Sequence, residues 1–396
     1  MQAQSTPYSE QHRGAHPGQL FSYPFRIFFL SLTLLSLVSI PAWVLQVTGT
    51  ISLPLAMPGI LWHQHEMLFG FLSAAIAGFL LTAVCVWTGT ERTHGIRLFL
   101  LWSIWVVARV LLTVGEDLPV WLVQGVNLVF LPLVMLDAGW RIGKARQKRQ
   151  LMILVVLGLF WLMQLGFVMR LDMIFAQGAL ILALALISII GGRITPAFST
   201  GWLRQRGLAA DRVRVVPALD LASVIAMILL LGALVSGLIT VTAILAIVAA
   251  TLMLIRLYGW KGWLVYREPL LWILHLSILW VPVALVLLAG SLVAGWPTSA
   301  WTHAAGTGAV ACLILGVIAR VSLGHTGRAM ELPTGMVLAF IAIHLAALVR
   351  VATAFGVFPW PAGVTASALL WTFAYATFLA LYTGILASPR VDGKPG

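Results

Sequence analysis

The sequence predicts an all-α integral membrane protein, a polytopic bundle of about 12 transmembrane helices. Hydrophobic residues make up 61% of its 396 residues and charged residues only 9%, and the mean hydropathy is +1.01. A water-soluble fold of this length could not bury so much apolar surface. The apolar runs are continuous and about 20 residues or longer, whereas the strands of membrane β-barrels are short and alternate, so the spans are predicted to be helices.

The first apolar stretch, residues 27–47, is predicted to be a membrane helix, because it is too long for the apolar region of a signal peptide and has no small-residue cleavage site. Trp62 and Trp87 bracket the second run, as expected of a span with aromatic residues at both interfaces. The predicted spans are 23–47, 60–88, 96–115, 118–140, 150–169, 173–192, 215–236, 239–258, 268–292, 304–321, 332–356 and 361–387. They form one transmembrane domain, residues 21–388, between tails at 1–20 and 389–396.

Special residues mark several of these spans. The segment 191–196, GGRITP, predicts a sharp exit from the sixth helix. Pro282 falls inside the ninth span and predicts a kink there. Small residues recur every four positions in segment 70–78 of the second span and segment 308–316 of the tenth, which allows neighbouring backbones to approach closely in lipid.

The charges of the loops predict the orientation. One set of alternate loops is acidic, with Glu116, Asp117 and Asp172 opposed only by Arg170. The other set is basic, at 92–97, 141–149, 193–214, 256–267 and 320–328. By the positive-inside rule, the basic loops and both termini are predicted to be cytoplasmic. The net charge of +12 therefore faces the inner leaflet of the lipid bilayer, and we expect no nucleic-acid partner.

The two cysteines and the absence of motifs exclude several chemistries. Cys85 and Cys312 lie in apolar runs and are predicted to be small core residues. Neither Cys-x-x-Cys nor Cys-x-x-Cys-His occurs, so neither a dithiol redox pair nor covalently attached haem is indicated. No nucleotide-binding glycine motif or hydrolase motif is present, so the sequence identifies no catalytic motif and leaves enzymatic activity open.

Ionisable residues inside a span are costly and mark candidate sites. His63, His65 and Glu66 lie at the outer end of the second helix, and His303 opens the tenth helix on the same side. On a regular helix His63, Glu66 and Met67 share a face and His65 points away, so both histidines bind one ion only if the first turn is irregular. The residues leave three interpretations open: solvated interfacial side chains, a metal or haem site, and a proton path.

Five further groups lie in or near the membrane. His275 is about two turns into the ninth helix and His344 is near the middle of the eleventh, where each is either a hydrogen-bond bridge or a ligand. His325 is at the cytoplasmic end of the tenth helix. Arg109 and Arg350 are close to the outer ends of their helices, where each either extends to the interface or binds an anion such as a haem propionate.

The motifs WHQHEMLFGF, IIGGRITP and HAAGTGAV…ARVSLGHTGR together resemble the NnrS family of bacterial inner-membrane proteins, over nearly the whole chain. The resemblance implies a protein with non-covalent haem b and copper that takes part in the response to nitric oxide and nitrosative stress. The family motifs map onto Trp62, His63, His65, Glu66, Met67, Gly192, Arg193, His275, His303, Arg320, Gly324, His325 and Arg328. His344 falls in no family motif. Where the family tends to read HALTVGAMG, this chain has HAAGTGAVA.

Three classes of function remain. The resemblance favours a haem and copper protein of the inner membrane that binds or handles nitric oxide or a related small molecule, with an unidentified electron donor. Its candidate cofactor-binding residues are His63, His65, His275, His303, His325, Arg109 and Arg350, and its candidate metal ligands are His63, His65, His303, Glu66 and Met67. The second class is a proton- or ion-coupled secondary transporter, which the scarcity of buried carboxylates disfavours. The third is a non-catalytic membrane sensor or scaffold.

The alternation of charge predicts the outcome of a topology experiment. A reporter that is active only in the periplasm should be silent when fused after residue 390 and active when inserted near Gly295. Enzyme activity of the fusions in intact cells measures this directly. The opposite pattern would place the His63 end of the second helix in the cytoplasm.

Overall fold

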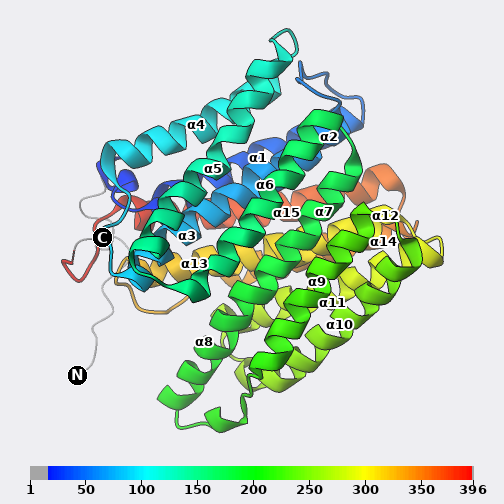
Figure 1. Cartoon of the computed structure of the whole chain (residues 1–396). Helices are drawn as coiled ribbons and strands as arrows, with labels where there is room; N and C mark the ends of the chain where they lie inside the picture. Colours follow the sequence, from blue (N-terminus) through cyan, green and yellow to red (C-terminus); the bar gives the residue numbers. More distant parts are fainter. Residues whose placement is uncertain (1–16, 395–396) are drawn as a thin grey trace.

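The computed structural model describes residues 17–394, which form a bundle of helices (Figure 1). Twelve helical stretches in this part of the chain are long and apolar enough to cross a membrane, and no strand occurs among the described residues. The predicted all-α bundle of twelve spans is confirmed. Of the predicted polar tail, residues 1–16 lie outside the described residues, and Pro17–Phe21 forms a short 3-10 helix whose Phe21 ring packs against Trp102.

Nine spans are single α-helices and three are interrupted by a π-helical turn. The single helices are α1 (Pro24–Val47), α4 (Gly95–Val114), α5 (Val120–Lys144), α6 (Leu151–Arg170), α9 (Pro217–Val235), α10 (Ile239–Trp260), α11 (Pro269–Val293), α14 (Met336–Ala354) and α15 (Trp360–Ala387). The interrupted spans are α2–η3–α3 (Gly59–His65, Glu66–Leu72, Ser73–Thr88), α7–η5–α8 (Met173–Leu186, Ile187–Gly191, Gly192–Gln205) and α12–η8–α13 (Thr298–His303, Ala304–Ala311, Cys312–His325).

The interrupted spans form the interior of the bundle. In the most apolar window of each, 72–78% of the residues are buried, against 28–61% in the nine single helices. Helix α7 contacts the π turn of each of the other two interrupted spans, η3 and η8. The single helices lie mostly around them and expose long apolar side chains, as a lipid-facing surface requires.

The order of single and interrupted spans divides the chain into three successive groups of four spans. The first comprises α1 to α5, the second α6 to α10 and the third α11 to α15, and in each group the second span is the interrupted one. The last helix of each group packs against the first helix of the next: α5 on α6, α10 on α11, and α15 back on α1. The groups therefore close into a ring around the three interrupted spans.

Each π turn has a backbone carbonyl that accepts a hydrogen bond from a side chain of the same group. Trp105 Nε1 of α4 donates to Gly70 O (3.1 Å), Arg256 Nη2 of α10 donates to Ser188 O (2.9 Å), and the Tyr375 hydroxyl of α15 donates to Ala311 O (2.9 Å). A π turn interrupts the regular α ladder, and water is absent from the interior of a membrane bundle. The neighbouring helix supplies the partner instead.

The predicted exit from the sixth helix at residues 191–196 is wrong, because this helix continues through Pro196 to Gln205. The two glycines make room for a neighbour and do not end the helix. A Cβ atom at Gly192 would overlap the guanidinium of Arg256, and one at Gly191 would lie 3.0 Å from Ile278. Arg256 also departs from its predicted place in a basic loop, since it is buried in α10 and forms an ion pair with Asp220 (2.8 Å).

Two further predictions concern residues inside the spans. The tenth span begins at Thr298 and not near residue 304, so His303 lies more than one turn inside the helix and does not open it. Cys85 and Cys312 are buried free thiols, as predicted. The described ends of the chain meet at one end of the bundle, where Arg26 Nη1 of α1 donates to Ser388 O (2.7 Å) just after α15. We call this the inner end and the opposite end, which holds His63 and His303, the outer end.

The hydrogen bond from Tyr375 to Ala311 O gives a prediction about stability. Replacing Tyr375 with Phe leaves that carbonyl without its side-chain donor and should lower the free energy of unfolding by about 1–3 kcal/mol. Tyr258→Phe is the matched control, because Tyr258 is 67% exposed. Removal of its hydroxyl group should change the free energy of unfolding by less than about 0.5 kcal/mol. Thermal unfolding in detergent compares them, and equal stabilities of both variants and the parent would contradict the role of this bond.

Candidate functional site

A cavity of about 330 Å³ lies at the outer end, among α1, α2, η3, α7, α12, η8, α14 and α15. His63, Met67, His303 and Arg350 line it together with apolar side chains and several amide and hydroxyl side chains. Its volume is within the range of small-molecule sites in proteins. We call it the outer cavity, and it brings together four of the residues that the sequence singled out.

The hydrogen bonds of His303 define which of its nitrogens is available. Nδ1 lies 2.7 Å from Ser299 O, one turn earlier in α12. A carbonyl oxygen can only accept, so Nδ1 of a neutral ring carries the proton and Nε2 retains its lone pair. Histidines that bind metals commonly donate their other N–H to a backbone carbonyl in this way.

His63 is held by stacking and not by hydrogen bonds. Its ring lies against Trp43 of α1, with 4.8 Å between ring centroids and 12° between planes. Its Nδ1 is buried and has no hydrogen-bond partner among the described residues. Buried polar atoms are almost always paired, so an unpartnered imidazole nitrogen in a residue that lines a cavity is consistent with a ligand there.

His65 and Glu66 lie outside this cavity in a separate buried cluster. Glu66 Oε1 is 3.1 Å from Arg109 Nη1 and 3.6 Å from His65 Nδ1, and Arg109 also donates to Asn127 Oδ1 of α5. Helical residues are about 100° apart, so His63 and Met67 point to the cavity while Glu66 lies on the flank of that face. Arg109, for which the sequence left snorkelling or anion binding open, is paired with Glu66.

Gly70 allows this cluster to form. A Cβ atom at this position would lie 2.5 Å from Arg109 Nη1 and 3.0 Å from Glu66 Oε2. Helix η3 therefore needs glycine there so that the guanidinium of α4 can reach the carboxylate. Sequence reasoning missed Asn127 and Ser299. The signal for Asn127 was an amide inside the apolar run 118–140, and the signal for Ser299 was its position one helical turn before His303.

The remaining histidines are spread through the bundle. His275 Nε2 lies 2.9 Å from Ser199 Oγ of α8, and the His325 ring packs on Phe25 at the inner end. His344 Nδ1 accepts a hydrogen bond from Trp280 Nε1 (3.2 Å), so it bridges two helices. Within residues 17–394, no three His, Cys, Asp or Glu side chains come close enough to hold one metal ion. The structure thus brings His63, Met67, His303 and Arg350 to one cavity and places His65, Glu66, Arg109, His275 and His325 outside it.

A smaller cavity of about 100 Å³ adjoins the outer one. All of its lining side chains are apolar, and they belong mainly to α3, α7, η5 and α13. Val310 of η8 lines both cavities. A cavity without polar groups holds no ordered water and can accommodate small apolar molecules. An apolar cavity thus shares Val310 with the cavity that His63 and His303 line.

Comparison with known proteins agrees with this arrangement of motifs. The profile of one family, described as NnrS protein, matches residues 19–390. The chain belongs to the NnrS family. No protein with a curated description matches it. Membership in NnrS supports a role in the nitric oxide response at the level of the family. The match includes both π turns next to the outer cavity and the whole Glu66 cluster.

The buried pair Glu66–Arg109 predicts strong coupling. Glu66→Gln or Arg109→Gln alone leaves one uncompensated buried charge and should cost about 3–5 kcal/mol of stability, whereas the double variant should cost less than the sum. Unfolding midpoints in detergent measure the coupling. Glu91→Gln, which breaks an exposed pair with His94, is the control and should leave the midpoint unchanged. Strictly additive effects at Glu66 and Arg109 would contradict the pairing.

Proposed function

We propose that this member of the NnrS family is a bacterial inner-membrane protein that binds nitric oxide at a metal centre in the outer cavity, as part of the response to nitrosative stress. The observation that carries the proposal is that His63 and His303, from two different interrupted spans, line one cavity. His63 has an unpartnered nitrogen there, and His303 has a proton-free one. A scaffold role needs no such pair of nitrogens, and the scarcity of buried carboxylates disfavours an ion-coupled transporter.

The side chains present fit copper. Imidazole nitrogen and thioether sulfur are ligands that copper accepts, and His63, His303 and Met67 offer both kinds in one cavity. Ser299 fixes the His303 ring through Nδ1, and Trp43 fixes the His63 ring by stacking. His65 and Glu66 are left out of this proposed ligand set because neither of them lines the outer cavity, and Glu66 is paired with Arg109.

The cavity also fits the polar parts of haem b. Non-covalent haem needs a histidine ligand and a partner for its propionates. Arg350 lines the outer cavity, and its Nη1 has no hydrogen-bond partner among the described residues. A guanidinium binds a carboxylate in a bidentate manner. When bound, haem iron with an open coordination position supplies a site for nitric oxide.

The apolar lining of the cavity beside Val310 is suited to a small uncharged ligand. Nitric oxide is such a molecule, and it enters a dry apolar space without losing strong hydrogen bonds to water. An anionic or highly polar substrate would be excluded from this side. The two cavities together therefore favour a diatomic gas over an ionic cargo for this protein.

The proposal predicts which histidines hold metal. His63→Ala and His303→Ala should each deplete copper or haem in the purified protein by about tenfold, since second-shell changes alone typically cost 10- to 100-fold in affinity. His344→Ala and His275→Ala are matched controls, because these rings hydrogen-bond to Trp280 and Ser199 outside the cavity lining. Absorption of the haem Soret band and elemental analysis of copper measure the contents of each variant.

The same variants test the function in cells. A strain that lacks this protein should grow normally without nitric oxide and poorly when exposed to it, and the parent sequence should restore growth. A variant with both His63→Ala and His303→Ala should fail to restore it while still inserting in the membrane. Full metal content in both single variants, or full protection by the double variant, would exclude the outer cavity as the nitric oxide site.

A further inference from the structure

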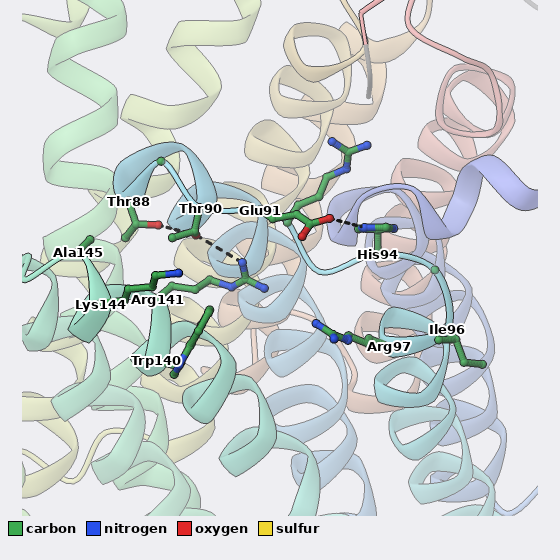
Figure 2. Close-up of a pocket in the computed structure, with 13 residues that line it drawn as sticks. Thr88, Thr90, Glu91, His94, Ile96, Arg97, Trp140, Arg141, Lys144 and Ala145 are labelled. Atoms are coloured by element: carbon green, nitrogen blue, oxygen red, sulfur yellow. Dashed lines mark hydrogen bonds and ion pairs between the residues drawn. The ribbon is translucent and has the colours of Figure 1, made fainter.

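A third cavity, of about 750 Å³, lies at the inner end of the first group of helices (Figure 2). It is formed by the loop 88–95 between α3 and α4, by the start of α4 and by the end of α5. We call it the inner pocket. It is distant in sequence from His63 and His303, shares no lining residue with the outer cavity, and plays no part in the proposed metal site.

The walls of the inner pocket carry more positive than negative charge. Arg92, Arg97, Arg141 and Lys144 line it, against the single carboxylate of Glu91. Neither Arg97 nor Lys144 forms an ion pair within the part of the chain that the structure describes. In Figure 2, Arg97 and Arg141 extend from opposite sides toward the space beneath the loop. An anion bound in this space would contact both guanidinium groups.

The two ion pairs at this pocket fix its shape without cancelling its charge. Arg141 is held by both oxygens of Asp137 (3.0 and 3.1 Å) and by Thr93 Oγ1 (2.8 Å), so its guanidinium is a rigid part of the wall. Glu91 is hydrogen-bonded by His94 (3.0 Å), which lowers the pKa of its carboxyl group. The nearby charges of Arg97 and Arg141 lower that pKa further, which shows the positive field of the pocket.

The surface below the pocket is apolar and exposed. Lys144, Trp140 and Leu136 are four residues apart on α5, so they lie on one face of the helix, and the Lys144 ammonium sits over the Trp140 ring at 5.1 Å. Trp140 is 62% and Leu136 68% exposed. From the pocket toward the membrane interior, this face therefore presents a cation, an interfacial aromatic ring and an aliphatic side chain.

We propose that the inner pocket binds an anionic phospholipid, with the headgroup phosphate between Arg97, Arg141 and Lys144 and the acyl chains along Trp140 and Leu136. The sequence of charge, ring and aliphatic side chain along α5 matches the depth profile of a phospholipid in a bilayer. A free phosphate would use the cations alone and would gain nothing from the exposed apolar face. The proposal is independent of the metal chemistry at the outer end.

The experiment uses short-chain lipids and the full-length protein in detergent. Dioctanoyl phosphatidylglycerol is the probe, dioctanoyl phosphatidylcholine has the same chains without net charge, and inorganic phosphate has the charge without chains. Native mass spectrometry counts bound molecules across a titration. For the parent we expect one phosphatidylglycerol site that is about tenfold tighter than binding of phosphatidylcholine, and no comparable binding of phosphate.

Variants assign the site to the inner pocket. Arg97→Gln combined with Lys144→Gln should weaken phosphatidylglycerol binding about tenfold, and Trp140→Ala should weaken it to a smaller extent. Arg206→Gln is the matched control, because Arg206 also lies over a tryptophan, Trp202 at 4.1 Å, but does not line the pocket. Thermal unfolding confirms that each variant is folded, as expected for exposed side chains.

Three results would overturn the proposal. Equal binding of the two lipids would show that the cations do not select the headgroup. Phosphate binding as tight as that of phosphatidylglycerol, lost in the double variant, would identify a soluble anion as the occupant. Unchanged lipid binding in the double variant, or an equal loss in Arg206→Gln, would place the lipid elsewhere on the protein.

Discussion

The structure depends on one constraint, that every backbone carbonyl inside a membrane must find a partner in the protein. Three inner spans interrupt their α ladder with π turns, and each time a side chain of another span in the same group donates to a carbonyl there. The donors are an indole, a guanidinium and a phenol, at Trp105, Arg256 and Tyr375. These bonds tie the outer helices of each group to its inner span, and the ring of three groups is built on them.

The same interruptions place the candidate site. The outer cavity lies where two of the π turns, η3 and η8, begin, directly after the helical turns that carry His63 and His303. π turns recur at functional sites because they reorient side chains locally within an otherwise straight helix. Here His63 and Met67 line the cavity, whereas Glu66, the first residue of η3, is paired with Arg109.

The spans could be predicted from the sequence because length and apolar composition decide them. The arrangement inside could not. The charge pattern counts Arg256 with a basic loop, and only the fold shows that Asp220 and Ser188 are its partners inside the bundle. The segment before Pro196 predicts a helix end from its glycines, although Gly192 makes room for that same arginine within a continuous helix. The residue types of the candidate site were predictable. Their division into two clusters, His63 and His303 in one and His65 and Glu66 in the other, depends on contacts between distant helices.

The closure of the ring from α15 to α1 has a consequence for biogenesis. Arg26 is fully buried in the first span, and the carbonyls that accept from its Nη1, Leu386 and Ser388, lie 360 and 362 residues later in the chain. During synthesis the first helix therefore enters the bilayer with a guanidinium that lacks these two acceptors until the twelfth helix has been made. Because Arg26 is the third residue of α1, its side chain can extend to the membrane interface until then. The fold is completed by the last helix to leave the ribosome.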